Sequence, residues 1–389
     1  MPKAHGIMKD HPHIIIGGGI IGLSIGWQLL RAGRPVEIYE ESAIPRSGAG
    51  WNAAGMLAPH AEAGYEEEAL YNLCLQGLSA YPEFLSELRE DVRENEVPAL
   101  DRCGSMIVAV TADDSVILQR QFEFRKKLGQ DGMELIRGAE AREREPLLSP
   151  KVKQALYLAN DGQINNRKLI SALHEAFLNR GGIIHEHQQV DRVVVRKGKA
   201  EGVEVSGVSR NASSITVAPG ALAGKIKGID PIGIRPVKGQ VVTLKSEPSA
   251  ELHHLIRSPR IYLAAKDDGR LLVGASAEEK GLDRRITAGP IMELLHYAWE
   301  VLPAVYELEI TELQSGMRPA SRDNCPIIGQ ADEEGLYYAT GHYRNGILLA
   351  PLTAYALRDE ILLGTKRADL QVFSPSRFSQ EAHIIEEVV

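Results

Sequence analysis

The residues best suited to chemistry near the start of the chain are the glycines of Gly17-Gly18-Gly19-Ile20-Ile21-Gly22. Gly17 permits a tight turn, Gly19 lets the backbone approach a pyrophosphate, and Gly22 lets a helix pack closely against a strand. The free N–H groups of a helix that begins at Ile20 would then face an anion. We therefore predict that this segment, with Ile20 and Ile21 included, binds the phosphates of a nucleotide cofactor.

The elements around this motif have the order that a dinucleotide site requires. The apolar run His13 to Ile16 predicts a strand before the glycines, and helical spacing predicts a helix from Ile20 to about Arg31. A second predicted strand, Val36 to Tyr39, leads directly into Glu40. A carboxylate about 20 residues beyond the glycines can accept hydrogen bonds from ribose hydroxyls, so Glu40 is predicted to bind the cofactor.

An arginine later in the chain is placed to bind a carboxylate. Arg318 stands in Gly316-Met317-Arg318-Pro319, after a predicted strand from Glu309 to Gln314. At a strand end beside a proline-stiffened turn, a guanidinium is well positioned and can bind a carboxylate through two hydrogen bonds. A structural salt bridge is the alternative role for this side chain.

A second inward-pointing helix N-terminus is predicted near the end of the chain. The strand Leu336 to Ala339 leads through the segment from Thr340 to Gly346 into a helix that ends near Leu363. A nicotinamide enzyme has no evident need for this element. A reduced flavin gathers negative charge at its N1–C2 carbonyl edge, which a helix N-terminus stabilises. This feature favours FAD over NAD.

A loop of small residues is predicted from Gly48 to Gly64, before a helix from Glu66 to Leu88 that is broken at Pro82. Within it, Ala53-Ala54-Gly55-Met56-Leu57 has no bulky side chain at its centre, so the backbone could lie close to a flat ligand. A flexible surface loop is the alternative interpretation.

Composition limits the classes of function. The chain has 389 residues, of which 44% are hydrophobic, so two domains are expected. A net charge of −8 with scattered cationic residues argues against nucleic acid and membrane surfaces as partners, and no apolar stretch is long enough to span a bilayer. Cys74, Cys103 and Cys325 form no CxxC pair, which argues against disulfides and a metal site and favours a cytoplasmic location.

The middle of the chain predicts an antiparallel sheet. Strands are expected at Val241 to Leu244, Ile261 to Ala265 and Arg270 to Ala275, and Asp268-Gly269 between the last two is a strong hairpin signal. A helix from Ile291 to Leu302 has one apolar face, which we interpret as core.

Three short strands precede this sheet. They are predicted at Ile183 to His187, Val190 to Val195 and Gly202 to Val205, after a helix from Asn166 to Asn179. We interpret them as a return to the nucleotide-binding sheet, in which the backbone of Val190 would lie near the adenine.

These motifs together resemble the D-amino-acid-oxidase family of FAD-dependent oxidoreductases, most closely its glycine oxidase branch, which serves thiamine biosynthesis. The resemblance covers roughly residues 13 to 365. It rests on the opening glycine motif with Glu40, Ala53-Ala54-Gly55-Met56-Leu57, Pro236-Val237-Lys238-Gly239, Gly316-Met317-Arg318-Pro319, Asp323 with Pro326-Ile327-Ile328-Gly329, and Gly341-His342-Tyr343-Arg344-Asn345-Gly346-Ile347-Leu348-Leu349-Ala350-Pro351.

The resemblance implies an α/β fold with a doubly wound, Rossmann-like FAD domain and a substrate domain built on an antiparallel sheet. Residues 1–85, 150–235 and 315–370 would form the FAD domain, 86–149 and 236–314 the substrate domain, and 371–389 a tail. Arg318 would bind the substrate carboxylate and Tyr262 would hydrogen-bond to it. The implied FAD-binding residues are Gly17, Gly19, Ile20, Ile21, Gly22, Glu40, Ala53, Ala54, Gly55, Met56, Val190, Gly341, Arg344, Asn345, Gly346, Ile347 and Leu348.

The implied reaction is the oxidation of glycine, sarcosine and small D-amino acids by hydride transfer to flavin N5. The imino acid would hydrolyse to a 2-oxo acid, and molecular oxygen would yield hydrogen peroxide. In such chemistry the protein accelerates the reaction mainly by orienting the substrate relative to the flavin. The resemblance also implies a homotetramer. An amino-acid dehydrogenase that passes electrons to a carrier, and a flavoprotein without turnover, are the alternatives.

Three departures from the family pattern affect these expectations. Gly316 falls near the position of the cysteine that bonds flavin in related sarcosine oxidases, and Cys325 lies too far along, so FAD should be noncovalent. Ala277 stands where a bulkier apolar residue is expected, which predicts a wider pocket. The segment Ala221-Leu222-Ala223-Gly224 lacks the family's tryptophan, which leaves the local packing there open.

Overall fold

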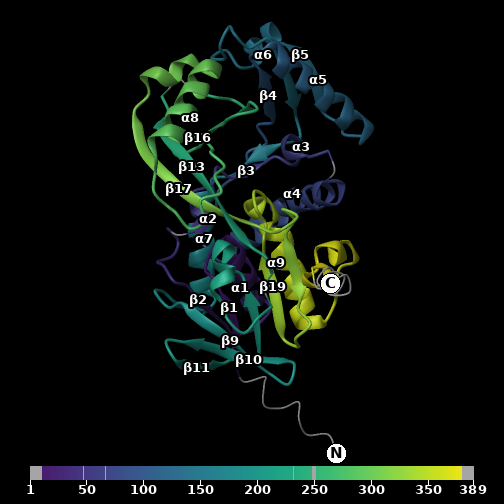
Figure 1. Ribbon diagram of the computed structural model, residues 1–389, viewed down its shortest axis with the longest axis vertical. Helices are drawn as coiled ribbons and strands as arrows, with labels where there is room; N and C mark the ends of the chain where they lie inside the picture. Colours follow the sequence, from purple (N-terminus) through teal and green to yellow (C-terminus); the bar gives the residue numbers. More distant parts are fainter. Residues whose placement is uncertain (1–10, 47, 66, 231, 248–250, 379–389) are drawn as a thin grey trace, which may run out of the picture.

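The protein is described by a computed structural model over residues 11–46, 48–65, 67–230, 232–247 and 251–378. It contains a largely parallel sheet and a largely antiparallel sheet, which occupy the lower and upper halves of Figure 1. The expected α/β fold class, with a second part built on an antiparallel sheet, is confirmed.

The first sheet has six strands and holds the start of the chain near its centre. Each strand runs parallel to its neighbours except the edge strand β18, which is antiparallel to β19. In spatial order the strands are β18 (Ile327–Gln330), β19 (Leu336–Thr340), β12 (Ser214–Val217), β1 (His13–Ile16), β2 (Val36–Tyr39) and β8 (Ile183–His185).

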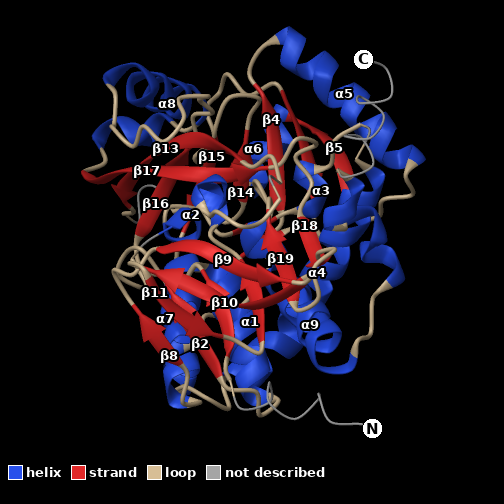
Figure 2. Cartoon of the chain, turned by 60° about the horizontal axis from the view of Figure 1, so that its bottom comes forward, coloured by secondary structure: helices blue, strands red, loops and turns tan. Residues whose placement is uncertain are grey.

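The two faces of this sheet are covered differently. Ile15 packs among the helices α1 (Ile20–Arg31), α4 (Glu68–Leu88), α7 (Asn166–Asn179) and α9 (Gly346–Leu363). Ile14 and Ile16 instead pack against a three-stranded sheet of β9 (Val190–Arg196), β10 (Lys199–Val205) and β11 (Val208–Asn211). This small sheet comes toward the viewer in Figure 2. The prediction that β9 and β10 return to the nucleotide-binding sheet was therefore wrong, because they pair with each other and cover its face; only β8 joins it.

The second sheet has eight strands. Its order is β17 (Ile310–Ala320), β13 (Arg235–Lys245), β16 (Arg270–Gly274), β15 (Tyr262–Ala265), β14 (Leu255–Arg257), β4 (Ser105–Ala109), β6 (Gln154–Leu158) and β5 (Met133–Arg137). The predicted hairpin is confirmed, because β15 and β16 pair antiparallel across the Asp268-Gly269 turn. Helix α8 (Ala288–Val301) packs its apolar face on one side of the sheet, while α5 (Ala112–Lys127) and α6 (Gly138–Arg144) lie beside β5 (Figure 1).

Some local expectations need correction. Helix α4 runs unbroken through Pro82, because tertiary contacts hold it: the Tyr81 hydroxyl donates to the Ile347 carbonyl of α9 at 2.6 Å. Strand β6 pairs with β4 and β5, although it lies within a segment that we assigned to the FAD domain. The domain boundaries otherwise stay a prediction, and the part of the expected tail beyond residue 378 lies outside the described residues. No helix within the described ranges is long and apolar enough to cross a membrane.

Candidate active site

A cavity of about 780 Å³ is lined by residues of both main sheets. One end is formed by the glycine motif and Glu40, and the other by Tyr262 and Arg318. The lining therefore joins the two groups of residues that sequence reasoning assigned separately to a nucleotide and to a carboxylate. Most of the predicted site residues line this one cavity: Gly17, Gly19, Ile20, Ile21, Glu40, Ala53, Ala54, Gly55, Met56, Tyr262, Arg318, Arg344, Asn345, Gly346, Ile347 and Leu348.

The glycine motif forms a turn with no room for side chains on its inner side. Gly17 has φ +105°, and a Cβ there would lie 2.4 Å from the Ala218 carbonyl oxygen. A Cβ on Gly22 would lie 2.0 Å from the Gly17 oxygen, so helix α1 packs directly on the turn, and Gly22 itself does not line the cavity. At Gly19 no described heavy atom lies within 4 Å of such a Cβ. The N-cap Gly19 also makes no side-chain hydrogen bond to the first amides of α1, so an open, uncapped helix start is present that fits a pyrophosphate.

Glu40 holds the glycine turn in place. Its Oε2 accepts from the Gly18 amide at 2.8 Å, and its Oε1 accepts from the Ser42 amide at 3.0 Å. Burial raises the pKa of this carboxyl, and the two amide hydrogen bonds oppose that shift. The predicted contact with a ribose stays a prediction, but the carboxylate also organises the backbone that would receive the phosphates.

The small-residue segment is more regular than predicted. It contains α2 (Gly48–Trp51), the strand β3 (Met56–Leu57), which pairs with β7 (Gly162–Gln163), and α3 (Pro59–Glu62). Gly55 has φ +68°, and a Cβ there would lie 2.2 Å from the Ile164 carbonyl oxygen, so backbone packs directly on backbone. The expectation of an irregular loop was wrong, because pairing with β7 orders it.

The N-terminus of α9 reaches the cavity, as the sequence predicted. Its N-cap, Asn345, makes no side-chain capping hydrogen bond, so the first amides remain available to a ligand. Gly341 does not line the cavity; it has φ +73° in the turn before α9. Sequence analysis gave no role to His342, which is buried and whose Nε2 lies 3.1 Å from the Thr353 hydroxyl; burial lowers the pKa of His342 to about 3, so its ring is neutral.

Arg318 lies within a strand rather than at its end, because β17 continues to Ala320. Its Nη1 donates to the Ser276 carbonyl at 3.0 Å. The guanidinium occupies the space above Gly239 on β13, where a Cβ would lie 2.5 Å from Nη2. Among the described residues no carboxylate oxygen lies within 4.0 Å of it, so it forms no structural salt bridge there. Burial lowers the pKa of Arg318, but an arginine stays cationic in a protein.

The side chains of Tyr262 and Arg318 interact electrostatically, because each shifts the pKa of the other. Its ring covers Gly274 of β16, where a Cβ would lie 2.2 Å from the hydroxyl oxygen. Burial raises the pKa of Tyr262 to about 12, so the phenol stays protonated and can donate a hydrogen bond. The structure thus brings together the two predicted substrate-binding residues.

Val190 is placed apart from the large cavity. It is buried at the start of β9 and lines a small hollow of about 40 Å³ together with Gly17, Glu40 and Pro219. It therefore lies beside the nucleotide end, and its contact with a cofactor stays a prediction.

Sequence reasoning missed an ion pair in the cavity wall. Glu62 of α3 bonds to Arg257 of β14, and both side chains are more than four-fifths buried. Burial alone would raise the pKa of Glu62, but the positive charges of Arg257, Arg344 and Arg318 together lower it. The two partners are 195 positions apart, so no local pattern could reveal the pair.

A buried carboxyl positions the helix that carries Glu62. Asp161 accepts from the amides of His60 and Ala61, both at 3.0 Å, and from the Ser105 hydroxyl at 2.6 Å. Burial raises the pKa of Asp161 to about 6, despite these three donors. Asp161 therefore ties the short α3 to strand β4 of the second sheet.

The structure also places the residues at which the sequence departs from the family pattern. Gly316, Ala277, Ala221 and Leu222 line the cavity. Cys74, Cys103 and Cys325 all lie in the described part of the chain, and none of them lines it. Among the same residues no group of three or more metal-ligating side chains is gathered.

Comparisons with known proteins agree with this geometry. A family model described as FAD dependent oxidoreductase matches residues 13–360. The chain is 32% identical over 370 residues to a glycine oxidase from Geobacillus kaustophilus, covering 93% of this chain and 96% of that protein. A crystal structure of glycine oxidase from that organism matches with a TM-score of 0.86 over 94% of this chain and 98% of the other, at 32% identity.

Two further proteins are similar to this chain over most of its length. A bifunctional protein ThiO/ThiG from Synechocystis is 33% identical over 369 residues, which cover 94% of this chain and 54% of that protein. A crystal structure of glycine oxidase from Bacillus cereus is 28% identical, with a TM-score of 0.83 over 92% of this chain and 96% of the other.

Proposed function

Because this chain belongs to the DAO family of FAD-dependent oxidoreductases, we propose that it oxidises the amine of small amino acids. The substrates would be glycine, sarcosine and small D-amino acids, and the products a 2-oxo acid with ammonia or an amine. Oxygen would accept the electrons and yield hydrogen peroxide. The observation that carries this proposal is Arg318, a cation without a described carboxylate partner, in the same cavity as the glycine turn.

The cavity residues fit FAD. The turn at Gly17 and the open amides of α1 suit the pyrophosphate, the β3 segment suits a flat ring, and the uncapped start of α9 suits an anionic flavin edge. When bound, FAD supplies the acceptor for the hydride that leaves the α-carbon. We propose noncovalent binding, since no cysteine lines the cavity.

The chain's own residues would orient the substrate rather than exchange protons with it. Arg318 would hold the α-carboxylate through two hydrogen bonds, and the Tyr262 hydroxyl would donate a third. Both side chains are fixed on strands, so the α-carbon would be held in one position relative to the cofactor. Both side chains are largely buried, so bulk water screens these charge-assisted bonds less than it would at the surface.

We also propose, as the sequence suggested, a cytoplasmic homotetramer that contributes to thiamine biosynthesis. Sedimentation of the purified holoprotein tests the tetramer, and a complementation assay in a thiamine-requiring strain tests the pathway.

The decisive experiment mixes the purified holoprotein with glycine, sarcosine and D-alanine, first without oxygen and then in air. Loss of the visible absorption band of the oxidised flavin, followed by peroxide in air, is the expected result. Loss of the band without peroxide would favour a dehydrogenase. An unchanged band with all three amines would reject the proposal. Arg318→Ala is the control, since it should retain FAD while losing activity toward amino acids.

A further inference from the structure

The β16–α8 loop, residues 275–287, connects the substrate end of the cavity to its nucleotide end. Near the start of this loop, the Ser276 carbonyl accepts from Nη1 of Arg318 at 3.0 Å. Near its end, Nη2 of Arg284 lies 3.9 Å from Oε1 of Glu41, the residue after the predicted ribose ligand. Arg284 also lines the cavity. A loop of the second sheet therefore brings a cation to the end of the cavity that is built from the first sheet.

Two buried residues of β13 fix the backbone of this loop next to Arg284. Nζ of Lys238 donates to the Arg285 carbonyl. The Gln240 side chain holds the end of the loop, because its Oε1 accepts from the Thr287 amide at 2.8 Å and its Nε2 lies 2.9 Å from the Thr287 hydroxyl. The side chain of Arg284 thus extends from a backbone that is anchored on both sides of it.

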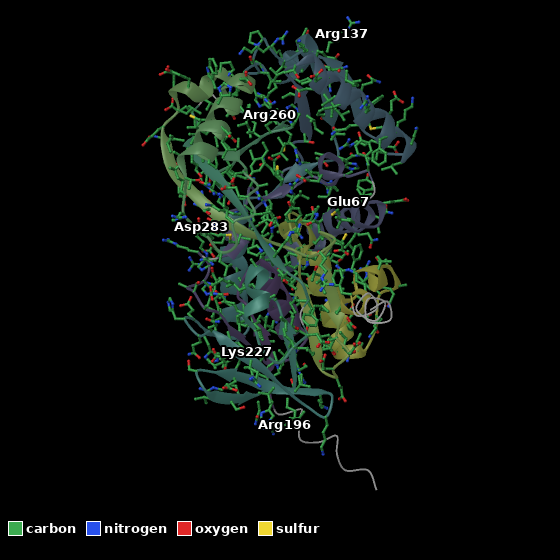
Figure 3. All side chains as sticks on the ribbon, in the orientation of Figure 1. Glu67, Arg137, Arg196, Lys227, Arg260 and Asp283 are labelled. Carbon is green, nitrogen blue, oxygen red and sulfur yellow. The ribbon has the colours of Figure 1, made fainter. Side chains whose placement is uncertain are left out.

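Arg284 differs from the charged residues on either side of it. Asp283 and Arg285 bind each other, because the amide and Nε of Arg285 donate to Oδ1 of Asp283 at 2.9 and 3.0 Å. Figure 3 labels Asp283 on the left of the molecule, below Arg260 and above Lys227. Of the three described residues from 283 to 285, Arg284 alone lines the cavity.

The guanidinium of Arg284 is held loosely. Its side chain is 60% exposed, and the 3.9 Å to Glu41 is too long for a hydrogen bond. Glu41 has another cation nearby, since Nζ of Lys225 lies 3.8 Å from its Oε2. An exposed ion pair of this kind contributes little to stability, so Arg284 can turn away from Glu41 at a small cost.

A dinucleotide at this end of the cavity needs a counter-charge for its phosphates. Glu40 and Glu41 both line the cavity here, and the N-terminus of α1 supplies a partial positive charge. Burial raises the pKa of Glu40, and the positive charge of Arg284 is among the effects that oppose this shift. Among the described cations that line the cavity, Arg284 is the one within 4.0 Å of an acid of the nucleotide end.

We propose that Arg284 binds a phosphate group of FAD and so closes the nucleotide end of the cavity over the cofactor. The loop backbone stays in place, the side chain turns from Glu41 to the phosphate, and Glu41 keeps Lys225 as its partner. The second sheet then contributes to cofactor binding as well as to substrate binding. This inference concerns FAD and does not depend on which amine the protein oxidises.

Titration of the apoprotein with FAD, followed by flavin fluorescence, tests the inference without turnover. In Arg284→Gln the dissociation constant should rise by at least about fivefold, because a charge-assisted hydrogen bond is lost, and FAD affinity should depend less on salt. Arg285→Gln is the matched control, since it removes the same charge from a side chain outside the cavity lining, and its dissociation constant should stay within about twofold. Unchanged affinity in Arg284→Gln, or equal losses in the two variants, would overturn the inference.

A double-mutant cycle with Glu41→Gln separates a contact with phosphate from the neutralisation of Glu41. If Arg284 acts by neutralising that carboxylate, Arg284→Gln should cost no FAD affinity once Glu41 is replaced, and the inference fails. If Arg284 binds phosphate, Arg284→Gln should weaken FAD binding at least as much in this background as in the unaltered protein.

Competition with ADP and adenosine identifies the group that Arg284 binds. Both compounds are used to displace FAD, and the ratio of their affinities should fall in Arg284→Gln but not in Arg285→Gln. The ratio is internally controlled, because general damage to the cavity weakens both compounds. An equal ratio in Arg284→Gln and the unaltered protein would contradict a contact with phosphate.

The amine assay separates this inference from the proposed function. If glycine, sarcosine and D-alanine all leave the flavin oxidised, the proposed function fails, and the FAD titrations still decide the role of Arg284. If these amines reduce the flavin while Arg284→Gln binds FAD as tightly as the unaltered protein, the proposed function stands and the present inference fails.

Discussion

The substitution Gly239→Ala would test how the protein positions Arg318. Gly239 lies opposite Gly316 in the pairing of β13 with β17, and the guanidinium of Arg318 fills the space where a side chain would be. A Cβ at this position would lie 2.5, 2.6 and 2.7 Å from Nη2, Nη1 and Cζ of Arg318. All three atoms of the head group would therefore collide with one methyl group.

The size of the effect follows from these distances. The shortest contact must open from 2.5 Å to an ordinary van der Waals distance of about 3.4 Å, so the guanidinium has to move by roughly 0.9 Å. A displacement of about 1 Å in a positioning group costs up to roughly 100-fold in rate. The hydrogen bond from Nη1 to the Ser276 carbonyl would be lost or bent as well. We expect kcat/KM for amino acids to fall by about 10- to 100-fold, with the FAD content unchanged.

The assay is a double-mutant cycle with Arg318→Ala, read as kcat/KM and as the affinity for a carboxylate inhibitor. If Gly239 acts only through Arg318, the alanine at 239 should cost nothing further once the guanidinium is gone. Gly289→Ala is the matched control, because no described atom lies within 4 Å of a Cβ at that helix position. An equal loss in the presence and absence of Arg318, or no loss in either background, would refute this reasoning.

Three other predictions concern the cofactor end and the stability of the fold. Glu40→Gln leaves one of the Gly18 and Ser42 amides without its acceptor, so FAD should dissociate about tenfold more readily while the melting temperature of the apoprotein barely changes; flavin fluorescence during dilution measures this, and unchanged retention would argue against it. Gly22→Ala forces α1 away from the Gly17 oxygen, only 2.0 Å from the new Cβ, so the protein should be purified without FAD and be less stable by about 1–3 kcal/mol in urea; full flavin content would contradict the tight packing. Asp161 has a pKa of about 6 in the folded protein, above its unfolded value, so the folded state binds the extra proton between about pH 4 and 6 and the free energy of unfolding should fall as pH rises through that range. In Asp161→Asn, up to roughly 3 kcal/mol of this pH-dependent change in the free energy of unfolding should be lost. If the free energy of unfolding has the same slope against pH in both proteins, this prediction is rejected.

The sequence predicted well those elements whose signals are local. The strand before Gly17, the helix Ile20–Arg31 and the strand Val36–Tyr39 agree with the structure, because turn glycines and apolar periodicity act over a few residues. The hairpin at Asp268-Gly269 is confirmed for the same reason. The prediction that Arg318 and Tyr262 share a site with the cofactor motif came from a family resemblance, which carries long-range information that spacing alone does not.

Long-range pairing was the part that could not be predicted. Strands β9 and β10 have the composition of sheet strands, but only the three-dimensional structure reveals that they pair with each other and cover the face formed by Ile14 and Ile16. The ion pair between Glu62 and Arg257 joins an acid and a base that are unremarkable in their own segments. The regular structure at Met56–Leu57 likewise depends on a partner strand about 100 residues away.

The cofactor motif belongs to one sheet and the carboxylate anchor to the other, so the geometry of any reaction depends on what joins the two. Three ties run along the cavity wall: the bond from the Tyr343 amide to Pro319, the pair of Glu62 with Arg257, and the contacts of Asp161 with α3 and Ser105. Each of them joins a segment that lines the cavity to a strand of the second sheet. A rigid connection between the two sheets favours a reaction whose rate depends mainly on substrate orientation. If the connection were flexible, the α-carbon would occupy many positions relative to the hydride acceptor. Weakening a tie should therefore lower kcat more than it lowers the affinity for either FAD or a carboxylate, since most of the residues that hold each ligand lie on one side of this connection.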